Sequence, residues 1–239
     1  MKLQDTYDLL RKFERCATEA EVSVVTLAAA SSLGAERYFA GSMPVFGASP
    51  TDQLKHVIGG SWPEEWAARY FSKGYLDDDP TIAHVRTSSA AMIWGKEVPA
   101  SKNARKVMSE ARAFGLKKGI TVPQGSLDGL TIGISFAGEH MDTSNPLATS
   151  KLTTIGSYAV ASILRVQRNG LNEKPVVLSD REKEVLYWVA EGKTGFEISI
   201  IMNRSTGTIE KHFRTLLEKL GTKNRAHAVA EALRRGIIR

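Results

Sequence analysis

Residues 178–194 read Leu-Ser-Asp-Arg-Glu-Lys-Glu-Val-Leu-Tyr-Trp-Val-Ala-Glu-Gly-Lys-Thr. Ser179 and Glu182 form the pattern of a capping box, in which each side chain accepts a hydrogen bond from the other residue's backbone N–H at the first turn of a helix. Gly192 is suited to end that helix, because glycine adopts the left-handed conformation that other residues resist. The segment therefore predicts a helix over residues 179–191, with Leu186 on its buried side.

The remainder of the segment 178–239 predicts only further helices. Helical periodicity and capping residues place them at residues 195–202, 206–220 and 225–235. Asn203 and Arg204 form a tight turn between the first two of these. Such a pair is typical of a helix-turn-helix, whose second helix enters the DNA major groove. A small bundle of four helices with merely solvated charges is the alternative that the helix pattern leaves open.

The helix over residues 206–220 carries the predicted base contacts. Ile209 and Phe213 must face a small core, so Glu210, Lys211 and Arg214 face outward. Arg214 can donate two hydrogen bonds to guanine, and Glu210 can accept one from cytosine. The residues placed to bond phosphates are Lys193, Thr194, Thr208, Lys223 and Arg225.

Basic residues are in excess in the same segment. It contains twelve Lys and Arg against eight Asp and Glu, and so carries +4 of the chain's net charge of +6. Such an excess favours an acidic partner, and double-stranded DNA is the partner that also fits a helix-turn-helix.

Specific motifs run through the whole C-terminal segment. Beyond residues 178–194 they are Glu197-Ile198, Thr-Ile-Glu-Lys-His at 208–212, Lys219-Leu220-Gly221, Asn224-Arg225 and Ala228-Val229. With these motifs the segment resembles the LuxR/GerE-type DNA-binding domain, in which Glu182, Leu186 and Gly192 match the three most characteristic positions. The resemblance favours a DNA reader over the inert bundle.

Residues 1–168 differ in kind, because strands and helices alternate there. Helices are predicted over 6–33 with a break near Thr18, and over 62–73, 80–89, 102–114 and 146–167. Strands are predicted over 37–45, 53–58, 91–94, 119–123 and 130–137. Strands enclosed by helices predict an α-β-α sandwich with a central antiparallel sheet, so the chain as a whole is α+β. Residues 169–177 are the predicted linker to the all-α domain at 178–239.

One set of residues in this first domain carries a second resemblance. Trp66 and Tyr70 lie four apart on one predicted helix, and Asp79-Pro80, Trp94 and Gly119 follow. Without further context the aromatic residues are core and Asp79 is a helix cap. In this spacing, however, the set resembles the autoinducer-binding domain of quorum-sensing LuxR regulators. A phosphorylated receiver domain is excluded, because its acidic pair, phosphoacceptor Asp and later Lys are absent.

The resemblance implies an N-acyl homoserine lactone as the ligand. Trp66 then donates to the lactone carbonyl, Tyr70 to the amide carbonyl, and Asp79 accepts from the amide N–H. Trp94 is an aromatic wall against the ring, and Ser135 adds a hydroxyl near the amide. The expected ligand-binding set is completed by Trp62 as a pocket wall, Pro80, Thr81 and Gly119.

Other functional classes lack the residues that they require. The histidines show no pairing at metal-ligand spacing, no Gly-x-Ser-x-Gly element occurs, and Cys16 is the only cysteine. A lactonase or another enzyme is therefore not expected, nor is a metal or a cofactor. No apolar run is long enough to span a membrane, and no signal peptide pattern opens the chain, which predicts a cytoplasmic protein.

The expected function is thus a ligand-dependent transcription regulator that binds a palindromic promoter site as a homodimer, with RNA polymerase as a further expected partner. The pattern does not separate an activator from a repressor, and it does not identify the acyl group. The alternative is a solo regulator or antagonist of the same family, which responds to a non-cognate signal or sequesters a partner regulator without synthesis of a ligand of its own.

Overall fold

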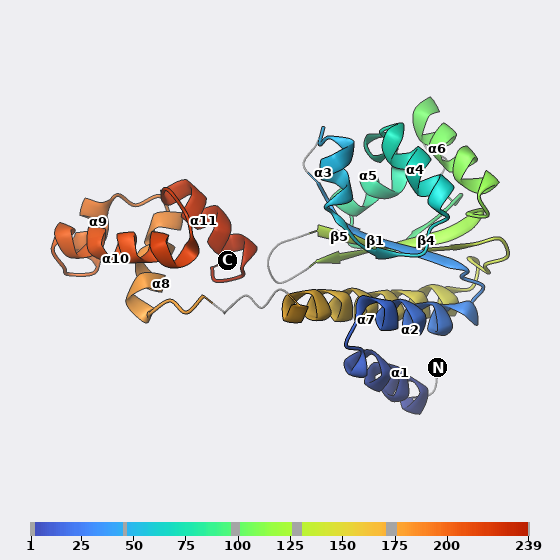
Figure 1. Ribbon diagram of the computed structural model, residues 1–239, viewed down its shortest axis with the longest axis horizontal. Coiled ribbons are helices and arrows are strands. Elements are labelled where there is room, and N and C mark those ends of the chain that lie inside the picture. Colours follow the sequence, from blue (N-terminus) through green and yellow to red (C-terminus); the bar gives the residue numbers. More distant parts are fainter. Residues whose placement is uncertain (1–2, 45–46, 97–100, 126–130, 171–175, 239) are drawn as a thin grey trace. The chain divides into compact units, whose positions relative to one another are not determined.

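The computed structural model describes residues 3–44, 47–96, 101–125, 131–170 and 176–238 (Figure 1). They form two compact units, one made of the described residues up to 170 and the other of residues 176–238.

The first unit is built on a five-stranded sheet. Its strands are β1 (Arg37–Ser42), β2 (Val57–Gly60), β3 (Met92–Ile93), β4 (Lys118–Gly125) and β5 (Thr131–Gly138). They follow the order β2-β1-β5-β4-β3, and every neighbouring pair is antiparallel. The predicted central antiparallel sheet is therefore confirmed.

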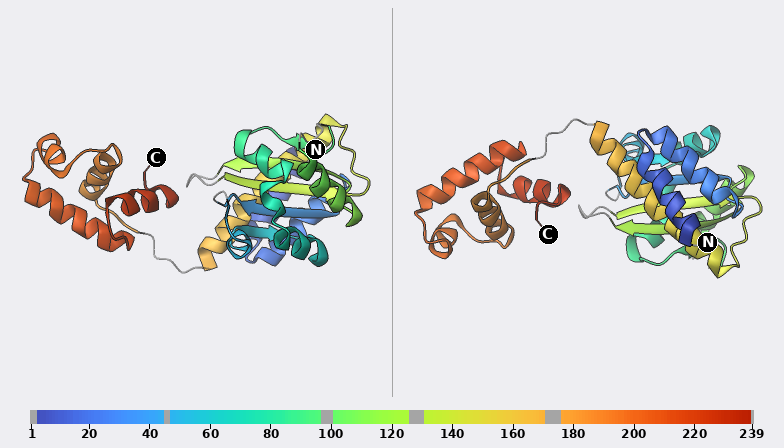
Figure 2. Two further views of the ribbon diagram at one scale, coloured as in Figure 1. Left: turned by 90° about the horizontal axis from the view of Figure 1, so that it is seen from above. Right: turned by 90° about the horizontal axis from the view of Figure 1, so that it is seen from below.

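Helices cover both faces of this sheet (Figures 1 and 2). On one face lie α2 (Glu19–Ser31) and α7 (Pro146–Gly170), with α1 (Leu3–Arg15) packed against both. On the other face lie α3 (Pro50–Leu54), α4 (Glu64–Ser72), the 3-10 helix η1 (Tyr75–Asp77), α5 (Pro80–Thr87) and α6 (Lys102–Ala113). This is the predicted α-β-α sandwich. Thr18 closes a capping box at the start of α2, where the sequence predicts the break between the first two helices.

Alternation along β5 divides the two sides of the sheet. Ile132, Ile134 and Phe136 are fully buried in the core that β5 shares with α2 and α7. The intervening Gly133 and Ser135 face the opposite layer, where a Cβ on Gly133 would lie 3.0 Å from Val85 of α5. Because these side chains are absent or short, space remains between the sheet and α4–α5.

One predicted strand is partly wrong. Residues 53–58 were expected to be extended, but Gln53 and Leu54 belong to α3, and β2 begins only at Val57. Ser49 caps α3 by accepting a hydrogen bond from Asp52 N, and Pro50 occupies the first turn. A serine cap followed by proline favours a helix start, which outweighs the short apolar alternation. The ends of the strands predicted over 37–45 and 130–137, Val45 and Leu130, lie outside the described residues.

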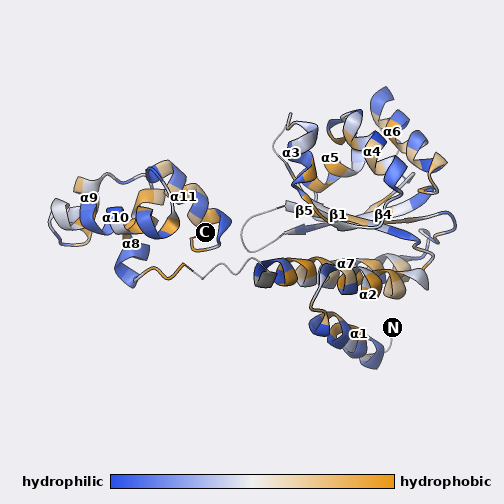
Figure 3. Ribbon diagram, viewed as in Figure 1, coloured by the Kyte–Doolittle hydropathy of each residue, from blue (hydrophilic) through white to orange (hydrophobic). Residues whose placement is uncertain are grey.

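The second unit consists of α8 (Asp180–Ala190), α9 (Gly195–Ile201), α10 (Thr206–Leu220) and α11 (Arg225–Arg234) within its described residues. The capping box of Ser179 and Glu182 is confirmed, Leu186 is fully buried, and Gly192 takes a φ of +76°. Asn203 has a φ of +51° in the turn between α9 and α10, a conformation that asparagine tolerates better than most residues. Hydrophilic and hydrophobic stretches alternate along these helices (Figure 3), as expected where one face packs on a shared core.

Candidate functional site

A cavity lies in the first unit between the sheet and helices α3, α4 and α5. Its floor is the face of the sheet that carries short side chains, with Gly41, Thr121, Gly133 and Ser135 among the lining residues. The cavity volume is about 40 Å³. Small-molecule sites usually measure roughly 300–1,000 Å³, so a ligand of that class requires lining side chains to move.

A buried carboxylate and a phenol meet at the cavity wall. The Tyr70 hydroxyl on α4 donates a hydrogen bond to Asp79 Oδ2 at 2.8 Å, and Thr81 N donates one to Asp79 Oδ1 at the same distance. Asp79 thus caps α5 with one oxygen and holds Tyr70 with the other. Burial raises the pKa of Asp79, although the hydrogen bonds from Thr81 and Tyr70 oppose that rise. Burial likewise raises the pKa of Tyr70 well above its usual value, and the adjacent Asp79 charge adds to the effect.

Trp66 lies beside this pair with an unsatisfied donor. It is 1% exposed, and its ring centroid is 5.8 Å from that of Tyr70. Its Nε1–H meets no acceptor among the described residues. Since a buried N–H without an acceptor is costly, this donor is the strongest sign of a ligand with an acceptor group at this place.

Trp94, which directly follows β3, forms a chain of hydrogen bonds with Thr121 of β4 and Ser135 of β5. Trp94 Nε1 donates to Thr121 Oγ1 at 2.9 Å, and the two hydroxyls of Thr121 and Ser135 lie 2.8 Å apart. Gly119 makes this possible, because a Cβ there would lie 2.6 Å from the Trp94 ring. Thr121 and Ser135 line the cavity. Trp94 is not among the lining residues, but its hydrogen bond to Thr121 orients the two hydroxyls.

Trp62 closes the cavity on the side of β1. Its indole stacks on Phe39 with ring centroids 4.0 Å apart and 21° between the planes, and it meets Tyr70 edge-on at 5.2 Å. All three residues line the cavity. The stacked pair is thus a bulky wall that can set how wide a ligand the cavity accepts.

The structure brings together most of the ligand-binding residues predicted from the sequence. Those that line the cavity are Trp62, Tyr70, Asp79, Thr81 and Ser135. Those that are not among its lining residues are Trp66, Pro80, Trp94 and Gly119, although Trp66 contacts Tyr70 and Trp62.

Several lining residues were missed, notably Ser42, Gln53, His56 and Thr121. Thr121 could have been found from the two-residue period of its strand, whereas no pattern in the sequence marked Gln53.

The second unit presents the predicted contact face on α10. Glu210, Lys211 and Arg214 are all exposed there. Arg225 of α11 pairs with Glu210 at 2.7 Å and lies 5.1 Å from the centre of the Phe213 ring. The sequence assigned Glu210 and Arg225 to separate contacts, and the structure joins them.

The other predicted contact residues differ in their freedom. Lys223 is exposed and Lys193 is half-buried. The hydroxyl of Thr194 donates to Glu197, and that of Thr208 lies 2.8 Å from Ser205 Oγ, so both belong to helix caps. They reach phosphate only by exchanging or sharing these bonds.

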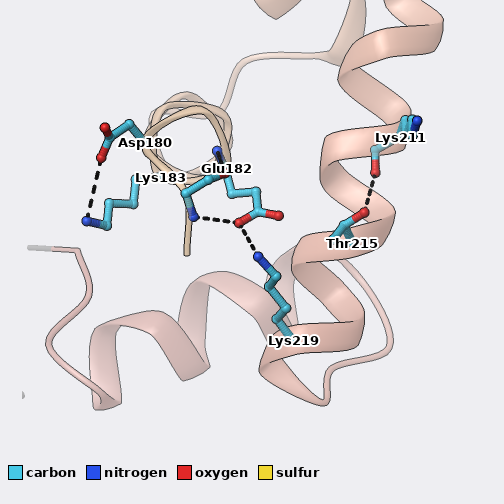
Figure 4. Close-up of polar contacts among 7 residues, drawn as sticks. Asp180, Glu182, Lys183, Lys211, Thr215 and Lys219 are labelled. Atoms are coloured by element: carbon cyan, nitrogen blue, oxygen red, sulfur yellow. Dashed lines mark hydrogen bonds and ion pairs between the residues drawn. The ribbon is translucent and has the colours of Figure 1, made fainter. Parts of the chain in front are cut away.

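Glu182 holds the second unit together rather than contacting a partner. It is 4% exposed, accepts from the backbone N–H of Ser179 at 2.7 Å, and accepts from Lys219 Nζ at 2.8 Å (Figure 4). Burial opposes ionisation of Glu182, but the hydrogen bonds from Lys219 and Ser179 outweigh it and lower its pKa. The pair ties the start of α8 to the end of α10.

Two features are absent from the described part of the chain. No helix there is long and apolar enough to cross a membrane. No group of three or more His, Cys, Asp or Glu side chains there is arranged to hold a metal ion.

Comparison with known proteins assigns both units. The family described as "Autoinducer binding domain" matches residues 18–166, and that described as "Bacterial regulatory proteins, luxR family" matches residues 176–232. The transcriptional activator protein PhzR of Pseudomonas fluorescens is 30% identical, over 95% of this chain and 92% of that protein. The quorum sensing-dependent transcriptional regulator RpaR of Rhodopseudomonas palustris is 33% identical, over 77% of this chain and 75% of that protein.

A solved structure agrees with the fold. The crystal structure of Escherichia coli SdiA superposes with a TM-score of 0.77 at 23% identity, covering 99% of this chain and 98% of that one. PhzR and RpaR are both described as transcription regulators. The chain therefore belongs to the LuxR-type quorum-sensing transcription regulators, with an autoinducer-binding domain followed by a LuxR-family helix-turn-helix domain.

Proposed function

We propose that this regulator senses an N-acyl homoserine lactone in the cytoplasm and, as a homodimer, binds a palindromic promoter site where it acts on RNA polymerase. In this proposal residues 1–168 bind the signal and dimerise, residues 169–177 are the linker, and residues 178–239 bind DNA. The observation that carries the ligand assignment is the buried, unpaired Nε1–H of Trp66 beside the Tyr70–Asp79 pair.

The polar groups of such a ligand match those of the site by an exchange of hydrogen bonds. The hydroxyl proton of Tyr70 is bonded to Asp79, so it cannot at the same time serve a ligand carbonyl. When the ligand's amide N–H takes its place at Asp79, Tyr70 is released to donate to the amide carbonyl. Trp66 then donates to the lactone carbonyl. Each buried group ends with a partner, which a pocket closed to water requires.

Thr121 and Ser135 support the same assignment from the sheet. Their hydroxyls line the cavity and are held by Trp94. In the proposal they lie near the ligand amide, while Trp62 and Phe39 contact the acyl group. The roles given to Pro80 and Gly119 are indirect: Pro80 starts α5 next to Asp79, and Gly119 leaves room for Trp94.

The DNA-binding proposal rests on α10. One helix of this length reads only a few base pairs, so two copies related by a twofold axis are needed to define a promoter site. Arg214 is proposed to read a base and Lys223 to hold phosphate. Further contacts to the DNA phosphate backbone are proposed for Lys193, Thr194, Thr208 and Lys211. Glu210 and Arg225 are proposed to contact DNA as a pair.

Thermal unfolding and DNA binding of the full chain, measured with a panel of N-acyl homoserine lactones, test this proposal. A ligand that binds only the folded protein stabilises it by about 2.7 kcal/mol at a hundred times its Kd. We expect at least one member to raise the melting temperature and to promote a dimeric complex with inverted-repeat DNA. If the whole panel leaves both melting and DNA binding unchanged, the chain does not sense this class of signal.

A further inference from the structure

A second group of polar side chains lines the cavity at the side of β1 and β2. Ser42 ends β1, Gln53 lies in α3, and His56 precedes β2. Ser42 Oγ lies 2.9 Å from His56 Nδ1, and Ser42 N donates to His56 O at 2.8 Å. These three residues are termed the distal cluster below.

Gln53 is the member with an unmet requirement. It is 4% exposed, and its Nε2 donates to Ala48 O at 2.9 Å. Its Oε1 accepts no hydrogen bond within the described part of the chain. Turning the amide over would break the bond to Ala48, so the buried Oε1 stays an acceptor that lacks a donor.

The distal cluster lies far along the sheet from the amide end of the cavity. In the register of β1 with β5, Phe39 pairs with Ser135 and Ser42 pairs with Ile132. Three residues along a strand span about 10 Å. His56 adjoins β2, which lies on the other side of β1 from β5. One elongated ligand can therefore meet Ser135 near one end and the distal cluster near the other.

We propose that the signal carries a hydroxyl group at the end of its acyl chain remote from the amide, and that Gln53 Oε1 accepts a hydrogen bond from that hydroxyl. A hydroxyl both donates and accepts, so it can at the same time receive a hydrogen bond from the Ser42–His56 pair. An alkyl end would leave Oε1 buried without a donor, and sites built around a ligand hydroxyl discriminate strongly against analogues that lack it. This inference rests on the proposed function, because it takes the amide end of the ligand to lie at Asp79.

Paired ligands test the inference. The probes are synthetic N-acyl homoserine lactones of graded chain length, each with a terminal methyl or a terminal hydroxyl, and one phenyl-acyl pair with and without a para-hydroxyl. The readout is the ligand concentration for half-maximal activation of a promoter reporter by the full chain. At the preferred length we expect the hydroxylated member to act at a concentration about tenfold lower, the value of one buried hydrogen bond. Equal or better activation by the methyl or phenyl members at every length would overturn the inference.

Two variants assign the preference to the distal cluster. Gln53→Met keeps the length of the side chain and removes the acceptor, so the preference should fall towards one. Ser135→Ala is the matched control at the amide end, where both members of each pair should weaken equally. Because Gln53→Met also loses the bond to Ala48, Ser42→Ala is measured beside it and should reduce the same preference. A preference that survives in both Gln53→Met and Ser42→Ala would show that the cluster does not read the ligand.

The same data separate this inference from the proposed function. Activation by both members of the pairs without any preference contradicts only the role of the distal cluster. A chain that responds to no member of either series contradicts the proposed function and this inference with it.

Discussion

Replacement of Trp66 by phenylalanine separates ligand binding from folding. The indole is buried and packs within 6.1 Å, between ring centroids, of Trp62, Tyr70, Tyr75 and Phe114. Its Nε1–H has no acceptor in the described residues. Phenylalanine keeps an aromatic ring in the cluster but removes the donor, so Trp66→Phe deletes a group that contributes nothing to folding and is proposed to hold the ligand.

Trp66→Phe should have opposite effects on the stability of the free protein and on its affinity for the ligand. In the free protein the buried donor costs about 1–3 kcal/mol, and its removal relieves that cost. The smaller ring leaves a void that costs about 1 kcal/mol, at roughly 24 cal/mol per Å³. The melting temperature of the free protein should therefore change little or rise. Ligand affinity should fall by about 1–3 kcal/mol, which is about five- to 150-fold.

The assay compares thermal unfolding without ligand with the ligand concentration for half-maximal reporter activation. Trp66→Ala is the control for packing, because it should lower both stability and affinity. If Trp66→Phe strongly destabilises the free protein and leaves the activating concentration unchanged, Trp66 is a core residue and its donor has no part in ligand binding.

Four further substitutions have defined outcomes. Asp79→Asn should weaken activation by about ten- to a hundredfold, since it loses a charge-assisted hydrogen bond, and an unchanged half-maximal concentration in a stably produced variant refutes the assignment. Arg214→Ala should cost about 1–3 kcal/mol in DNA binding and relax the base preference at one symmetric pair of positions in the site. Lys223→Ala should weaken binding to all DNA sequences alike and lower the slope of log affinity against log salt concentration by about one per subunit. Equal effects of the two substitutions would contradict the division into base and phosphate contacts. The lowered pKa of Glu182 contributes stability that is present above the ordinary pKa of a glutamate and is lost as the pH falls through the lower, folded-state value. Glu182→Gln should therefore lower the melting temperature at neutral pH and reduce the drop in melting temperature on acidification. If calorimetry shows the same dependence of melting temperature on pH in this variant, another group governs the acid sensitivity.

Local signals predicted the fold well where they act within one element. The helix break near Thr18, the capping box at Ser179 and the alternation of Ile132, Ile134 and Phe136 are confirmed by the structure. The strand predicted over residues 53–58 is partly wrong because a stronger local signal precedes it. Ser49 and Pro50 start a helix that includes Gln53 and Leu54.

The cavity could be predicted only in part, since its lining depends on how strands pair. Tyr70, Asp79 and Ser135 followed from the resemblance to the autoinducer-binding domain. Gln53 of α3 and His56, which precedes β2, also line the cavity, and β2 pairs with β1 through a register that shifts between Ala40 and Gly41. A register between strands is a tertiary property, and the sequence of either strand alone does not contain it.

The pairing of Glu210 with Arg225 changes how the contact face of α10 is understood. Their side chains are 49% and 41% exposed, so the ion pair contributes little to stability, about 0–1 kcal/mol. The effect of the ion pair is to fix the orientation of both side chains. Arg225 is also held against the Phe213 ring, and Gly195 of α9 lies so close that a Cβ there would be 2.7 Å from Glu210 Oε1.

A side chain that is ordered before binding avoids a cost of about 0.5–1.5 kcal/mol when the complex forms. Glu210 keeps a second carboxylate oxygen, and Arg225 keeps further N–H donors, beyond those in their mutual bond. We therefore infer that Glu210 and Arg225 act on DNA as one preformed pair that spans α10 and α11. The base contact predicted for Glu210 and the phosphate contact predicted for Arg225 are then made together by this pair.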